Sequence, residues 1–304
     1  MTTSTPSKSA AALRIERVGF TTLQDLGRPG WAHLGVPHSG AADRTSHALA
    51  NRLAGNTADA ATFETSGGLV LRAMRDTIVV LTGPDCEAFV DDVPLARCRA
   101  TRVAAGQRVR VARMHAGMRS YLAVAGGIDC AMMLGSRSHD TLSGTSSGIV
   151  PLQLSDGAEL SVGMRQREPH GLDVPITPIL DGRIRLSEGP HAELFPLQVL
   201  KQLLTKSGWT VSPSSNRIGV RLASSSNNTN SLVNELNSNS LGELDSMALV
   251  RGAVQLTPSG ELVVMLANHP TTGGYPVIAV MHTDDVDVIG QRSPGTMVTM
   301  VWTD

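Results

Sequence analysis

Short β-type segments separated by turn residues run through almost the whole 304-residue chain. Leu13–Val18 and Thr77–Leu81 are two of them: β-branched or alternating apolar residues bounded by Gly, Pro or Asp. Many short strands with turns between them are typical of β-barrels and β-sandwiches. The sequence therefore predicts a mainly β protein with a few helices. Further strands are expected at 68–72, 108–113, 119–124, 183–187, 209–212, 218–222, 253–257, 261–266, 277–282 and 297–301.

Two segments have helical spacing instead. Asp43 is a suitable N-cap for a helix over Arg44–Ala54, and Gly55 is a suitable stop. A second helix is expected from Pro196 to Lys206, because proline fits the first turn of a helix. Its i, i+3, i+7 stripe of Leu197, Leu200 and Leu204 predicts contacts with a core.

Three prolines and little periodicity between Gln166 and Asp181 indicate a boundary between two β-rich halves. We therefore expect a disordered tail at 1–12, an N-terminal subdomain at 13–170 and a C-terminal subdomain at 171–304. Ser and Asn dominate the stretch from Ala223 to Ser240, which predicts a mobile surface loop.

Composition excludes several function classes. The formal net charge is -1 and the basic residues are dispersed, which argues against nucleic-acid binding. The sequence contains no run of 18 apolar residues, so no membrane span is predicted. The N-terminus lacks the apolar core of a secretory signal. Three well-separated cysteines form no metal or disulfide pattern. These features predict a cytoplasmic protein with no bound metal.

The first segment that can carry chemistry runs from Thr22 to Arg44. Four glycines and two prolines there prevent regular structure, and a backbone bent at Gly and fixed by Pro can present side chains to a ligand. Arginines can grip a carboxylate or phosphate, and a histidine can handle a proton near neutral pH. The alternative is a structural loop whose Asp–Arg pairs cap the following helix. The candidate residues are Gln24, Asp25, Arg28, His38, Ser39, Asp43 and Arg44.

A second segment places the paired glycines Gly126 and Gly127 after a predicted strand, followed by Ser136, Arg137 and Ser138. Backbone N–H groups at paired glycines can approach an anion, with Arg137 as an additional donor. A tight β-turn is the equally good alternative. No P-loop pattern is present, and the chain has only three lysines, Lys8, Lys201 and Lys206.

Two later segments add candidates. Asn216 and Arg217 follow Ser215 in the string SNRIGVRL, and the run from Thr271 to Tyr275 joins two hydroxyls, a glycine pair and a tyrosine. Such a run can bind an oxyanion or carboxylate. The alternative is a hairpin connection between the strands at 261–266 and 277–282. The candidates in the second run are Thr271, Thr272, Gly273, Gly274 and Tyr275.

Taken in order, the strings QDLGRPGWAHLGVPHSGAADR, ANRLAGN, AVAGGID, LGSRS, SNRIGVRL and TTGGYPVIA resemble one family. It is known as the C subunit of 5-oxoprolinase, as allophanate hydrolase subunit 2 or as KipI antagonist (KipA). The match extends from about Leu13 to the C-terminus. The same module is similar to half of the carboxyltransferase domain of urea amidolyase. The resemblance implies two cyclophilin-like β-barrel subdomains.

The resemblance also implies a function. The family opens 5-oxoproline, a small amide, to glutamate with hydrolysis of ATP, which requires Mg²⁺. It does so as a hetero-oligomer with a KipI-like B subunit (allophanate hydrolase subunit 1) and a LamB/YcsF-like A subunit. His38, Asp43 and Thr272 are then expected to be catalytic, and the other candidates to bind substrate or nucleotide.

One departure from the family pattern bears on catalysis. An acidic residue and a glutamine are expected shortly before TTGGYP, and Asn268, His269 and Pro270 stand there instead. Two other functions therefore stay open. One is a regulatory partner of a KipI-like kinase inhibitor, without catalysis. The other is a biotin-dependent urea or amide carboxyltransferase subunit, although no lysine flanked by methionines is present to carry biotin covalently.

Overall fold

The computed structural model describes residues 11–140, 142, 153–176, 182–224 and 244–303. The chain packs as two compact units, and neither is continuous in sequence. Unit 1 comprises Met1–Leu26, Thr45–His139 and Pro151–Thr177, and unit 2 comprises Gly27–Arg44, Asp140–Val150 and Pro178–Asp304. The predicted division between residues 170 and 171 stays a prediction. The packing adds that 27–44 belongs with the C-terminal part of the chain.

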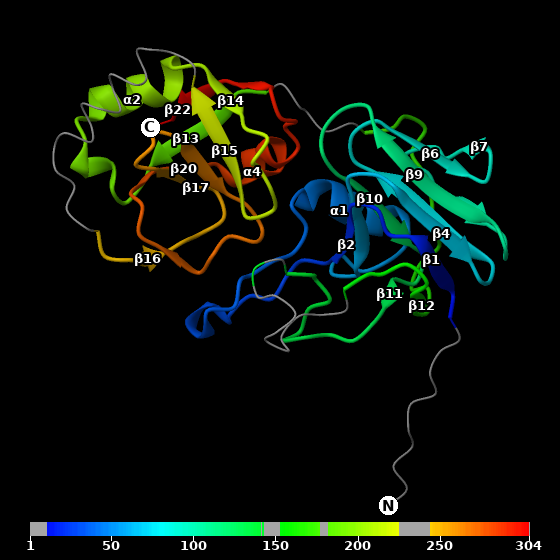
Figure 1. Ribbon diagram of the computed structural model, residues 1–304. Helices are drawn as coiled ribbons and strands as arrows, with labels where there is room; N and C mark the ends of the chain where they lie inside the picture. The colour runs from blue at the N-terminus through cyan, green and yellow to red at the C-terminus, as the bar shows by residue number, and fades with distance from the viewer. Residues whose placement is uncertain (1–10, 141, 143–152, 177–181, 225–243, 304) are drawn as a thin grey trace, which may run out of the picture. The chain divides into compact units, whose positions relative to one another are not determined.

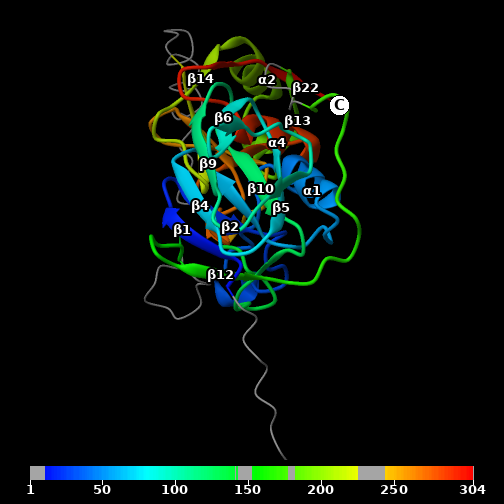
Figure 2. The same ribbon diagram turned by 90° about the vertical axis from the view of Figure 1, so that its right-hand side faces the viewer.

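Unit 1 consists of two antiparallel sheets whose apolar faces meet (Figures 1 and 2). Alternate residues such as Leu13, Ile15, Leu69 and Leu71 are fully buried, as period-2 side-chain alternation requires. The seven-stranded sheet has the order β11 (Ile128–Asp129), β12 (Glu159–Val162), β1 (Leu13–Arg17), β4 (Leu69–Ala73), β9 (Arg108–Met114), β6 (Cys86–Val90) and β7 (Val93–Pro94). The five-stranded sheet has the order β2 (Thr21–Gln24), β3 (Thr62–Thr65), β10 (Ser120–Val124), β5 (Thr77–Thr82) and β8 (Thr101–Val103).

The helix α1 (Arg44–Leu53) follows the predicted bounds. The chain turns away after the helix at Gly55, whose φ of +73° lies in the left-handed region that a non-glycine residue rarely adopts. The Oγ1 of Thr82 in β5 donates to the Ser46 carbonyl, 2.7 Å away, and this bond ties the helix to the five-stranded sheet.

Unit 2 is built on one eight-stranded sheet. β21 and β22 follow each other directly in the chain, yet β21 pairs with β14 at one end of the sheet and β22 with β13 at the other. The sheet is therefore nearly closed into a barrel. Its order is β21 (Met297–Val298), β14 (Trp209–Val211), β15 (Gly219–Ser224), β18 (Leu262–Met265), β17 (Ala253–Leu256), β20 (Val277–Met281), β13 (Ile184–Glu188) and β22 (Met300–Trp302). A separate pair joins β16 (Met247–Ala248) to β19 (Thr272–Gly273).

Two helices supply apolar side chains to the core of unit 2. In α2 (Leu197–Lys206), Leu200, Leu203 and Leu204 are buried, whereas Leu197 is exposed, so the predicted stripe is shifted by part of a turn. α4 (Thr283–Gly290), which the sequence analysis did not predict, buries Val286 and Ile289. Two 3-10 turns, η1 (Ala32–Leu34) and η3 (Ala192–Leu194), complete the described elements.

The prediction of a mainly β protein with few helices is confirmed. The alternative hairpin between the strands at 261–266 and 277–282 is wrong, because β18 and β20 both pair with β17 and not with each other. Residues 1–10 of the predicted tail and most of the predicted loop at 223–240 lie outside the described residues. Ala12, the last residue of that tail, is buried and hydrogen-bonded to Leu160. No helix among the described residues is long and apolar enough to cross a membrane.

Candidate functional site

Asp25 is the centre of a buried polar cluster in unit 1. Its Oδ1 accepts hydrogen bonds from the hydroxyls of Ser136 (2.6 Å) and Ser138 (2.5 Å), and its Oδ2 accepts one from the Arg137 backbone N–H (2.5 Å). The Asp25 N–H donates to Ser138 Oγ, 2.9 Å away. A carboxylate with three short internal donors is already solvated by the protein. Asp25 therefore holds two chain segments together rather than facing a ligand.

The other candidates of unit 1 are also engaged in the fold. The side chain of Arg137 donates to Cys130 O and Asp129, and Gln24 Nε2 donates to Thr22 and to His139 O. At the paired glycines, the Gly126 N–H donates to Asn56 Oδ1 and the Gly127 N–H to Val124 O. These two N–H groups hold a tight turn, so the turn interpretation fits better than an anion cradle.

The segment Gly27–Arg44 brings its polar residues into unit 2. Its start lies against His38: the Arg28 N–H donates to His38 O at 2.7 Å, and a Cβ on Gly27 would lie 2.5 Å from that same oxygen. Ser39 has a φ of +58°, which for a residue with a side chain costs about 1 kcal/mol. Strain of this kind is retained where the surrounding structure holds it, and it is frequent at functional sites.

Asn268 connects this segment to the β15–β18 side of the barrel. Its Oδ1 accepts Arg217 Nη2 at 2.9 Å and Ser39 Oγ at 3.4 Å, and its Nδ2 donates to Asp140 at 2.9 Å. Arg217 Nη2 also donates to Gly40 O, 2.5 Å away. The side chain of Asn268 is fully buried. Because the amide oxygen receives the guanidinium and the amide nitrogen faces a carboxylate, this network is built for asparagine rather than aspartate.

Asp287 organises the second half of the site. Its Oδ1 accepts Arg251 Nη2 at 2.6 Å and the Arg44 backbone N–H at 3.0 Å. Arg251 Nη2 also donates to Ala42 O at 2.9 Å. Burial first, and then the neighbouring Arg251, lower the pKa of Arg44, while Asp287 opposes this shift.

Two histidines lie beside these arginines. His38 Nδ1 is 3.1 Å from Ser39 O and His269 Nδ1 is 2.7 Å from Pro270 O. Because a carbonyl oxygen accepts only, each Nδ1 carries the proton and each Nε2 is left with a lone pair in the neutral ring. Burial is the largest cause that lowers the pKa of both rings. Arg44 and Arg251 lower both values further.

The arginine cluster consists of Arg28, Arg44, Arg217 and Arg251, together with His38 and His269. Asp287 pairs directly with Arg251 of this cluster. Asp140 faces the Asn268 amide, and Asp43 accepts Gln291 Nε2 at 2.8 Å. Such a site suits an anion, and the two neutral imidazoles can accept protons. Among the described residues no three His, Cys, Asp or Glu side chains meet as a metal site would require.

The remaining predicted residues lie apart from these contacts. Asn216 Oδ1 accepts the Ile218 N–H at 2.7 Å, which is a turn-forming role. Thr271 O accepts the Leu249 N–H, and Thr272 and Gly273 form β19. Gly274 and Tyr275 are exposed, and the Tyr275 carbonyl accepts Gln255 Nε2 at 3.0 Å. A catalytic role for Thr272 and a binding role for this run stay predictions.

No sequence pattern placed Arg251, His269, Asp287 or Gln291 in the site. Asp287 belongs to the unpredicted helix α4, and Gln291 follows it directly. Asp284 and Asp285 ahead of Val286 and Ile289 resemble the acidic first turn and apolar face of a short helix, and this signal could have revealed α4.

The carboxyltransferase domain model, subdomain A and B, matches residues 34–302. The chain therefore belongs to the carboxyltransferase domain family. It is 35% identical to the C subunit of 5-oxoprolinase from Escherichia coli (strain K12), over 95% of this chain and 90% of that protein. It is also 29% identical to the urea amidolyase of Saccharomyces cerevisiae, over 92% of this chain but only 16% of that much longer protein. The family resemblance inferred from the ordered strings is confirmed.

Solved structures agree on the fold. TTHA0988 superposes with a TM-score of 0.82 at 29% identity, covering 96% of this chain and 56% of that chain. The urea carboxylase of Kluyveromyces lactis superposes with a TM-score of 0.82 at 26% identity, covering 98% of this chain and 28% of that chain. In both cases this chain corresponds to one part of a larger polypeptide.

Proposed function

We propose that this chain is the C subunit of an ATP-dependent 5-oxoprolinase. The observation that carries the proposal is the 35% identity to the corresponding Escherichia coli protein across 95% of the chain. The reaction opens the lactam of 5-oxoproline to glutamate, in a complex with a KipI-like and a LamB/YcsF-like protein. The chain then acts in the cytoplasm as one member of a hetero-oligomeric hydrolase.

The arginine cluster fits one part of that reaction. 5-Oxoproline carries a carboxylate, which Arg44 and Arg251 can hold as a charge-assisted pair. The Nε2 atoms of His38 and His269 are unprotonated acceptors that can take a proton from water as the ring opens. Asn268 and Asp287 act as positioning residues, because they fix Arg217 and Arg251.

A site for Mg²⁺-bound ATP stays a proposal from the family resemblance, since Mg²⁺ is usually held by one or two carboxylates together with the phosphates of the nucleotide. The arginine cluster contributes the anion-binding and proton-accepting groups of the reaction.

The test is reconstitution of the full complex with its two partner proteins and assay of ATP-dependent glutamate release. Arg44→Ala is expected to lower kcat/KM at least tenfold, while Arg113→Ala, an exposed arginine on β9 of unit 1, is expected to leave it unchanged. Binding to the KipI-like partner without any turnover would instead favour the regulatory role.

The similarity to urea amidolyase and urea carboxylase favours a second candidate, transfer of a carboxyl group from biotin to urea or a related amide. The biotin would have to arrive on another protein. In the same reconstituted complex, carboxylation of urea that depends on an added biotinyl carrier would support this candidate, and no effect of the carrier would discard it.

A further inference from the structure

The strand β8 has an open edge in unit 1. β8 ends the five-stranded sheet and pairs only with β5, where Arg102 lies opposite Ile78. The Ile78 carbonyl accepts the Ala125 N–H, so the backbone groups of Ile78 are turned away from β8. In an antiparallel pair the opposite residue is then also turned away. The N–H and C=O of Arg102 therefore point to the outer edge of the sheet.

The chain itself covers this edge immediately before Arg102. The Ala100 N–H donates to His170 O at 3.2 Å, and the Leu172 N–H donates to Cys98 O at 2.9 Å. These two bonds add a short antiparallel segment to the edge. The pairing does not continue past His170, whose N–H is used by Leu53 O. The next outward residue in this register is Arg102, and its backbone has no partner within the described residues. The open part of the edge is this one residue, because the N–H and C=O of Ala104, the outward residue that follows, both bind Gln107.

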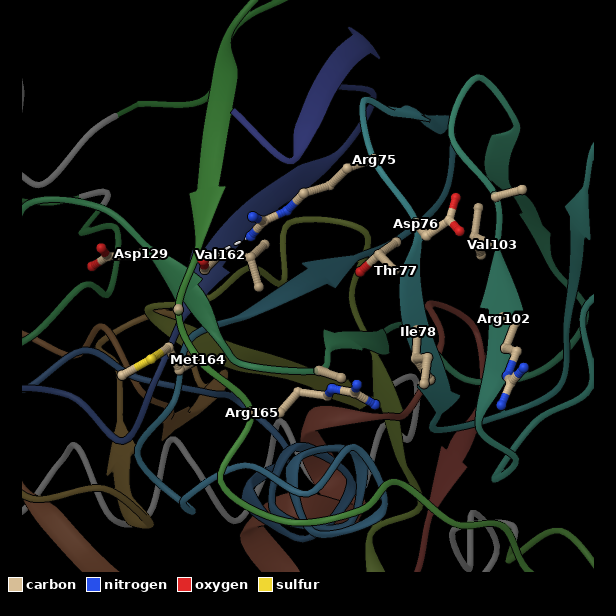
Figure 3. A pocket seen from close by; sticks show the side chains of 13 residues that line it. Arg75, Asp76, Thr77, Ile78, Arg102, Val103, Asp129, Val162, Met164 and Arg165 are labelled. Atoms are coloured by element: carbon tan, nitrogen blue, oxygen red, sulfur yellow. Dashed lines mark hydrogen bonds between the residues drawn. The ribbon is translucent and has the colours of Figure 1, made fainter. Parts of the chain in front are cut away.

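A groove of about 770 Å³ lies beside this edge (Figure 3). Ile78 lies between two arginines: Arg165 extends toward it from one side and Arg102 lies on the other. Met164 stands on the rim and is 91% exposed. The groove thus has an apolar centre with a guanidinium on each side.

The free charge of the groove is positive. Its lining has three arginines, Arg75, Arg102 and Arg165, against the two aspartates Asp76 and Asp129, and Asp129 also pairs with Arg137 at 3.0 Å. Arg102 forms no side-chain hydrogen bond or ion pair with the rest of the described chain, and Arg165 makes only a distant 3.8 Å pair with the exposed Glu168. The described lining contains no aromatic ring on which a base can stack. Carboxylates on a peptide suit it better than a nucleic acid.

We propose that the open edge of β8 and the groove beside it bind an extended acidic segment of a partner protein. The segment adds as a strand whose backbone pairs with Arg102, in the manner of β-strand addition to other exposed sheet edges. Alternate carboxylates of the segment lie over Ile78, between the guanidinium groups of Arg102 and Arg165. The surface belongs to unit 1 and does not depend on the reaction proposed for the arginine cluster of unit 2.

A fluorescent, end-capped heptapeptide of alternating Val and Glu tests the proposal against the full chain. We expect saturable binding that weakens with added salt. We also expect slower hydrogen exchange at the Arg102 amide in the complex. A matched Val–Lys peptide, free glutamate, inorganic phosphate and a short oligonucleotide are the competitors, and none is expected to displace the Val–Glu peptide at equal concentration.

Variants separate the backbone from the charge. Arg102→Glu combined with Arg165→Glu is expected to weaken binding at least tenfold, whereas Arg113→Glu, on β9, leaves it unchanged. Arg102→Ala removes the guanidinium and keeps the N–H. Arg102→Pro also removes the N–H, at an edge position that tolerates proline, and is expected to bind at least fivefold more weakly than Arg102→Ala.

Three outcomes would overturn the proposal. The first is no binding of the Val–Glu peptide at millimolar concentration. The second is equal binding of the Val–Lys peptide, a small anion or the oligonucleotide. The third is equal binding by Arg102→Ala and Arg102→Pro when both variants keep the wild-type unfolding midpoint, because the edge would then play no part.

Discussion

Two polar clusters contain residues of the same stretch of sequence. One surrounds Asp25 in unit 1, and the other includes residues from Arg28 to Arg44 in unit 2. In the first, the carboxylate has three internal donors within 2.6 Å. In the second, four arginines and two histidines with lowered pKa values lie together with three aspartates. A cluster whose charge is balanced internally stabilises a fold. A cluster with four arginines against three aspartates has a net positive charge that suits an anionic ligand, and this difference selects the second as the candidate site.

The largest expected effect tests the structural half of this comparison. Asp25→Ala leaves the buried donors of Ser136, Ser138 and Arg137 without an acceptor, and the free energy of unfolding is expected to fall by about 3 kcal/mol. Urea denaturation followed by circular dichroism measures this loss. Arg137→Ala, which removes a half-buried side chain and keeps the backbone donor, is the control. An Asp25→Ala protein of wild-type stability with reduced activity would reverse the assignment.

The next effect concerns the functional half. Arg44→Ala removes the guanidinium but keeps the backbone N–H that donates to Asp287. We expect KM for the anionic substrate to rise tenfold to a hundredfold, with an unfolding midpoint close to that of the wild type. Steady-state kinetics of the reconstituted complex measures KM. Equal losses of activity and stability would show that Arg44 is structural.

A smaller effect is expected at the departure from the family pattern. Asn268→Asp removes the amide nitrogen that donates to Asp140. It puts a second carboxylate beside Asp140 instead. Stability is expected to fall by about 1–2 kcal/mol near neutral pH. The double variant Asn268→Asp with Asp140→Asn restores one donor between the two positions and should recover most of the loss. A double-mutant cycle without coupling would mean that this contact is unimportant.

The pH dependence gives the smallest effect. The pKa values of His38 and His269 are held below their ordinary value of about 6.5, chiefly by burial. The unfolded chain then binds more protons, so this contribution to stability is present above pH 6.5 and is lost as the pH falls toward the folded pKa values. The urea midpoint of His38→Gln/His269→Gln should vary less between pH 7.5 and 5.5 than that of the wild type.

The same histidines report on the arginines directly. Arg44→Ala removes a positive charge that lowers the pKa of His38, so an NMR titration should find a higher pKa for this ring in the variant than in the wild type. Arg113→Ala, in unit 1, is the control and should leave the titration unchanged. A pKa of His38 that does not move would place Arg44 outside the cluster.

Local pattern was enough for most elements. Alternating segments such as Thr77–Leu81 and the capped segment Arg44–Ala54 became β5 and α1 almost at the predicted bounds, because period and turn residues act over a few neighbours. The family strings also located Arg28, His38, Ser39, Arg44 and Arg217. They could not separate Asp25 and Arg137, which hold unit 1 together, from the residues of the arginine cluster.

By itself the sequence determined a mainly β chain, its family and the strings that carry its polar residues. Only the tertiary structure decided which of those residues act together. Asn268 meets Ser39 across 229 positions and Gln291 meets Asp43 across 248 positions of the chain. Such contacts form because the nearly closed barrel brings strands and α4 from distant parts of the sequence next to one another. No short-range sequence pattern specifies that proximity. The open edge at Arg102 has the same origin, since it depends on where the segment His170–Leu172 stops pairing.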